Sequence, residues 1–178
     1  MNTTVLIVLI AVLIAATFLG YRRASGHAER ARRIAASQAE PVAAADFTTP
    51  QGAILMLEDA FRRRDLAAAV AAKDFRVEAE LALNAQPPAQ APTESAIVTR
   101  AAELEREFRE LMQSSWPDFA DVTTVFTGCE PYPPPPGNFS ASALAVVTEV
   151  NRFTGGGFSE HRILVAETPA GWRVLNPV

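Results

Sequence analysis

The pattern of hydrophobic and polar positions divides the chain into three zones. Residues 5–19 form an unbroken apolar run with one hydroxyl group and no charge. From residue 49 to residue 114, apolar residues recur at three- and four-residue steps, which predicts helices. From residue 122 to residue 176, apolar and polar residues tend to alternate, which predicts strands. The sequence therefore predicts an α+β domain behind a strongly apolar segment.

The apolar run predicts one transmembrane helix. A spanning helix needs about 20 apolar residues, and the flanking positions extend the run to that length. The alternative is a cleaved signal peptide, which normally begins with a positively charged segment. Here no Lys or Arg precedes the run, and Arg22 and Arg23 follow it directly. We therefore predict an uncleaved anchor over residues 1–21 that contacts the lipid bilayer through residues 4–21.

The charge distribution predicts the orientation of the chain. Residues 22–46 form an Ala-rich basic tether, in which residues 22–45 carry five arginines and two glutamates. Because positive charge is retained on the cytoplasmic side, we expect a single-pass protein of a bacterial inner membrane with a cytoplasmic C-terminal domain. The single cysteine is compatible with that compartment. From residue 46 onward, eleven basic and eighteen acidic residues argue against nucleic-acid binding.

The helical zone predicts several helices in succession. Thr49 and Pro50 are typical of a helix start, since Thr caps the first turn and Pro is favoured at its first position. Three arginines at positions 62–64 mark the end of this helix, either as solvated charges or as an anion site. Further helices are expected over residues 66–72, 73–83 and 94–114, the last with an apolar stripe of Ile97, Ala101, Leu104, Phe108 and Leu111.

The last zone predicts an antiparallel sheet. Strands are expected over residues 122–127, 141–153, 158–168 and 172–176. Residues 131–137 contain four consecutive prolines and are expected to form a rigid loop. Three glycines at positions 155–157 predict a hairpin connection between the two longest strands.

This order of elements resembles the nuclear transport factor 2-like (SnoaL-like) superfamily. The resemblance rests on the helix from Thr49-Pro50 to Phe61, the Arg64-Asp65-Leu66 junction, and the final Gly171-Trp172-Arg173-Val174-Leu175. It covers residues 47–178 and implies a cone in which a curved antiparallel sheet wraps around helices, often in a dimer. Between residues 83 and 94 the chain departs from the family, because a proline-rich loop replaces short strands.

Enzymes of this superfamily place proton-transfer groups inside the cone, and Glu149 and His161 are our candidates for such a pair. If their strands pair across the triple-glycine turn, the two side chains can approach each other. The alternative is an ordinary cross-strand ion pair on an open sheet face.

One cysteine and two histidines predict no metal cluster, and no glycine-rich phosphate loop or other cofactor motif is present. Glu130 is expected to raise the pKa of its neighbour Cys129 and so make the thiol unreactive.

Fold alone does not decide function, so three hypotheses follow. The first is a membrane-tethered, non-catalytic binding or scaffold domain that contacts a protein partner or a second copy through its sheet face. The second is a small-molecule isomerase or dehydratase that uses Glu149 and His161. The third is a toxin-immunity-type protein. An enclosed pocket with convergent polar groups would favour the enzyme, whereas a cone filled with side chains would favour the binding domain.

Overall fold

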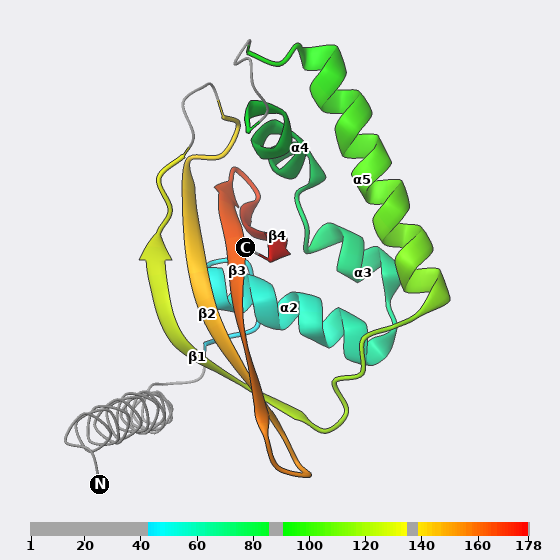
Figure 1. Cartoon of the computed structure of the whole chain (residues 1–178), viewed down its shortest axis with the longest axis vertical. Coiled ribbons are helices and arrows are strands. Elements are labelled where there is room, and N and C mark those ends of the chain that lie inside the picture. Colours follow the sequence, from blue (N-terminus) through cyan, green and yellow to red (C-terminus); the bar gives the residue numbers. More distant parts are fainter. Residues whose placement is uncertain (1–42, 86–90, 135–138, 178) are drawn as a thin grey trace, which may run out of the picture. The chain divides into compact units, whose positions relative to one another are not determined.

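The computed structural model describes residues 43–85, 91–134 and 139–177 (Figure 1). All of its helices and strands belong to one compact unit, Pro41–Val178. The predicted anchor and nearly all of the predicted tether lie outside the described residues. Within the described residues, none of the helices has the length and apolar character needed to cross a membrane.

In the described part of the helical zone there are four helices, α2 (Pro50–Arg63), α3 (Leu66–Ala71), α4 (Phe75–Asn84) and α5 (Glu94–Ser114). The start predicted at Thr49 and Pro50 is confirmed, because the Thr49 side chain accepts a hydrogen bond from the Gly52 backbone N–H. Each later helix also begins with a side chain that accepts from a backbone N–H of the first turn, which satisfies a group that the helix itself leaves unpaired. These capping residues are Asp65, Asp74 and Thr93.

The strand zone forms one four-stranded antiparallel sheet, so the predicted α+β class is confirmed. Its strands are β1 (Val122–Pro131), β2 (Ala143–Phe153), β3 (Phe158–Thr168) and β4 (Gly171–Pro177), and they are hydrogen-bonded in chain order. β1 continues past residue 127, where the sequence analysis ended it. A register shift between Phe126 and Gly128 allows this, because a bulge lets the strand resume its pairing with β2.

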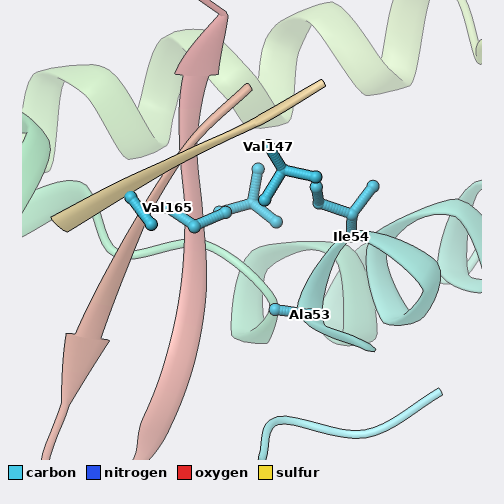
Figure 2. Close-up of a cluster of buried hydrophobic side chains, with 6 residues drawn as sticks. Ala53, Ile54, Val147 and Val165 are labelled. Carbon is cyan, nitrogen blue, oxygen red and sulfur yellow. The ribbon is translucent and has the colours of Figure 1, made fainter. Parts of the chain in front are cut away.

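Helices α2 and α4 pack against opposite faces of the sheet. The α2 cluster joins Ala53 and Ile54 to Val147, Val165 and their neighbours in the sheet (Figure 2). The α4 cluster joins Val77 to Leu144, Val146 and their neighbours. Odd- and even-numbered residues of β2 therefore face different helices, as expected where side chains alternate along a strand. Ile54, Val147 and Val165 are at most 2 % exposed, so side chains fill the space beneath α2.

Helix α5 corrects one residue of the predicted apolar stripe. Ile97 is buried and Phe108 is half-buried, as the pattern predicted, but Leu111 is 56 % exposed. Met112, which is 3 % exposed, takes the inward position instead. Leu111 follows Phe108 by three residues and Met112 follows it by four. These two positions differ by about 100° around the helix axis, so only one of them can continue the stripe.

Candidate functional site: a buried carboxylate pair

Two glutamates lie in the interface between α2 and the sheet. Glu58 follows Ile54 by four residues and therefore lies on the sheet-facing side of α2. Glu149 follows Val147 by two residues and therefore lies on the α2-facing side of β2. Only 2 % of Glu58 and 3 % of Glu149 is exposed. Carboxyl groups are seldom buried to this degree without partners, so their surroundings decide what they can do.

A chain of hydrogen bonds connects the two carboxyl groups. Thr124 of β1 and Asn151 of β2 are register partners and lie between them. The Thr124 hydroxyl oxygen is 2.7 Å from Glu58 Oε1 and 2.9 Å from Asn151 Oδ1. The Asn151 side-chain amide in turn contacts Glu149 Oε1. The chain thus runs from α2 through β1 to β2 and ties the helix to two strands.

Arg62 supplies the positive charge at this site. Its guanidinium lies 2.9 Å from Glu58 Oε2, one helical turn away, and 5.7 Å from the centre of the Phe119 ring. The Arg62 side chain is 38 % exposed, so the ion pair connects the buried carboxyl group to the surface.

Burial shifts the acidity of both glutamates in the same direction. Burial raises the pKa of Glu58, although the hydrogen bond from Thr124 and the charge of Arg62 oppose the change. Burial also raises the pKa of Glu149 to about 7, helped by the negative charge of Glu58 and opposed by the hydrogen bond with Asn151. The pair can therefore hold a proton at pH values where an exposed glutamate would have lost it.

The structure gives Glu149 and His161 very different surroundings. The predicted antiparallel pairing across the triple-glycine turn is present, and the two residues are direct register partners. Glu149 is buried against Asn151, whereas His161 is exposed and its Nε2 lies 2.9 Å from the Ser159 hydroxyl oxygen. The residues that share a hydrogen-bond chain with Glu149 are instead Asn151, Thr124 and Glu58.

The sequence analysis did not single out Glu58, Thr124 or Asn151. Glu58 carries a usable signal, since it occupies the fourth position after Ile54 in a helix whose neighbouring apolar residues face inward. Asn151 shares the strand parity of Glu149. The contribution of Thr124 depends on the register between β1 and β2, which the sequence pattern does not specify.

The remaining candidate chemistry is limited to a single thiol. Burial raises the pKa of Cys129, and the charge of Glu130 raises it further, as the sequence predicted for an unreactive cysteine. Within the parts of the chain that the structure describes, His, Cys, Asp and Glu side chains form no group of three that could hold a metal ion.

Comparisons with known proteins identify no relative of this chain. The chain matches no family model, no curated protein and no solved structure.

Proposed function

We propose that this protein is a membrane-tethered, non-catalytic binding domain of the nuclear transport factor 2-like type, and that its contact surface is the tip of the β2–β3 hairpin. One observation carries the proposal: Phe153 and Phe158, at the two sides of this tip, are 43 % and 46 % exposed. Aromatic side chains are enriched where proteins bind one another and are costly to leave in water. In Figure 1 the hairpin extends away from the helices, where a partner can reach it.

The tip presents one phenylalanine on each face of the hairpin. Phe153 follows Asn151 by two residues and shares its face, whereas Phe158 is the register partner of Arg152 and shares the opposite face. Gly156 and Gly157 have φ angles of 89° and 88°, which an L-residue with a side chain rarely adopts. The Gly156 backbone N–H donates to the Phe153 carbonyl oxygen at 2.9 Å, so the turn is tight, and a partner can contact both rings by enclosing it.

The charges around the tip support a protein partner in preference to a lipid surface. Arg152 and Glu160 lie on the hairpin, and Asp121 adjoins it, because its carbonyl oxygen accepts hydrogen bonds from the Thr154 backbone and hydroxyl, both at 3.1 Å. An apolar centre with a rim of mixed charge is typical of protein–protein contacts. Binding to anionic lipid would instead favour a cluster of basic residues.

Photo-crosslinking in the cells that produce the protein tests this surface. A photoreactive phenylalanine analogue at position 158 should give one discrete adduct with another protein. The matched control is the same analogue at Val98, which is 53 % exposed on α5, away from the hairpin, and should give none. Equal labelling from both positions, or no adduct from position 158, would contradict the proposal.

The proposed membrane anchor is based on the apolar run at residues 5–19 and is tested by a separate experiment. The 178-residue chain should stay in the membrane pellet after alkaline carbonate extraction, because a spanning helix is not removed by loss of electrostatic contacts. A chain that lacks residues 1–45 should move to the supernatant. Release of the longer chain by carbonate would reject the anchor but leave the hairpin proposal standing.

A further inference from the structure

We propose that Glu58 and Glu149 share one proton that completes the hydrogen-bond chain between α2 and the sheet, and that loss of this proton weakens the attachment of the helix. The argument begins with a count of hydrogens. Three contacts make up the chain: Glu58 to Thr124, Thr124 to Asn151, and Asn151 to Glu149. Each contact needs one hydrogen between its two polar atoms.

Thr124 and Asn151 provide only two of these three hydrogens. A threonine hydroxyl carries one hydrogen, and only one end of the Asn151 amide, the NH₂ group, can donate. With the Asn151 NH₂ group directed at Glu149, the Thr124 hydroxyl must donate to Asn151 Oδ1. Glu58 must then supply the hydrogen that lies between its own carboxyl group and Thr124.

The opposite orientation of the amide leads to the same count. With the Asn151 NH₂ group directed at Thr124, the hydroxyl is free to donate to Glu58. The Asn151 oxygen then faces Glu149 Oε1, and Glu149 must carry the missing hydrogen. The two orientations differ in which carboxyl group is protonated, but both require one proton on the pair.

The charged groups around the pair do not replace that proton. From α2, Arg62 donates to Glu58 Oε2, which is not the oxygen that contacts Thr124. From β3, His161 lies opposite Glu149 in register, but it is exposed and contacts Ser159. The β1 residues opposite Asn151 and Glu149 are Thr124 and Phe126, and neither carries a charge. The third hydrogen must therefore come from a carboxyl group.

Loss of the proton would change this interface in two ways. One of the three contacts would place two oxygen atoms together without a hydrogen, and two negative charges would then lie close together in a buried site with one arginine. The pKa of Glu149, raised to about 7 by burial, brings this change into the physiological range. The contact between α2 and the sheet is therefore pH-sensitive, and it is more stable at acidic than at basic pH.

Infrared spectroscopy of the 178-residue chain in lipid nanodiscs tests the shared proton. At pH 6 the wild-type protein should show the carbonyl stretch of a protonated carboxyl group, and the band should disappear as the pH is raised to about 8. Either Glu58→Gln or Glu149→Gln should remove the band, because the glutamine amide supplies the third hydrogen permanently and the remaining carboxyl group can ionise. Glu80→Gln is the matched control and should leave the band unchanged. Glu80 is equally buried in α4, but it takes no part in the hydrogen bonds between Glu58 and Glu149.

Two results would overturn the proposal. One is a wild-type spectrum without a protonated carboxyl band at pH 6. The other is a band that persists in both single glutamine variants, because the proton would then belong to a different group. The wild-type measurement needs no variant, so the proposal can be rejected even if a substitution prevents folding.

Discussion

Two buried carboxylate sites in this domain differ in how many hydrogen-bond donors each carboxyl group has. Glu80 of α4 is 2 % exposed, and it accepts from the Ser140 backbone N–H at 2.9 Å and from the Ser140 hydroxyl at 3.0 Å. Arg76 Nε adds an ion pair at 3.2 Å. One carboxylate thus meets three donors. At the α2 interface two carboxyl groups meet the Thr124 hydroxyl, the Asn151 amide and the Arg62 guanidinium.

The comparison shows that two equally buried carboxylate sites can differ in whether their hydrogen bonds are complete without an added proton. The contacts of Glu80 are complete without a proton of its own, so they attach the segment before β2 to α4 by ordinary charge-assisted hydrogen bonds. The contacts of Glu58 and Glu149 become complete only when a proton is added. The number of donors for each carboxyl group therefore distinguishes a structural carboxylate from a proton-holding pair.

The largest expected effect comes from the apolar contact beside the pair. Ile54→Ala should lower the free energy of unfolding by about 2–5 kcal/mol, because Ile54 is 2 % exposed in the α2 cluster and its loss leaves a cavity. Urea denaturation measures the change. A loss below about 1 kcal/mol would mean that α2 is not held by this packing, and the comparison of the two interfaces would lose its basis.

A smaller effect should separate the two hydrogen-bond systems. Thr124→Val keeps the shape of the side chain but removes the hydroxyl that connects Glu58 with Asn151, and it should cost about 1–3 kcal/mol at pH 6. Ser140→Ala is the counterpart at Glu80 and should cost about 1 kcal/mol, because the backbone N–H and Arg76 remain in place. A larger cost for Ser140→Ala than for Thr124→Val would contradict the difference drawn between the sites.

The smallest expected effect on stability is at the hairpin tip. The double variant Phe153→Ser and Phe158→Ser should change the free energy of unfolding by about 0.5 kcal/mol or less, because both rings are exposed. The same variant should abolish the adduct formed from a photoreactive residue introduced at Thr154, between the two substituted positions. A large loss of stability would show that the rings support the fold instead of a partner.

The pattern of the sequence predicted the elements better than it predicted the buried polar chain. The Thr49 cap, helix α5 and the β2–β3 hairpin follow from local signals, because helix caps, apolar periodicity and glycine turns act over a few residues. The inward position was assigned wrongly to Leu111 and belongs to Met112, since both residues fit a helical stripe until packing selects one. Glu58 and Thr124 meet across 66 positions of the chain, and no local pattern encodes that contact.

The pH dependence of unfolding tests the central claim most directly. The pKa of Glu149 rises from its ordinary value of 4.5 to about 7 in the folded protein, so the folded state binds the proton more tightly than the unfolded state. The stabilisation is then complete below pH 4.5 and is lost as the pH rises through about 7, by about 3 kcal/mol if Glu149 alone changes. Comparing each variant with the wild type at every pH cancels the contributions of other groups.

Urea unfolding of the 178-residue chain, followed by tryptophan fluorescence between pH 5 and pH 8, provides the measurement. We predict that wild type and Glu80→Gln lose stability in parallel over this range, and that Glu149→Gln shows a nearly flat profile and exceeds the wild type in relative stability as the pH rises. A wild-type profile that is flat or rising, or a Glu149→Gln profile that falls as steeply as the wild type, would contradict the shared proton.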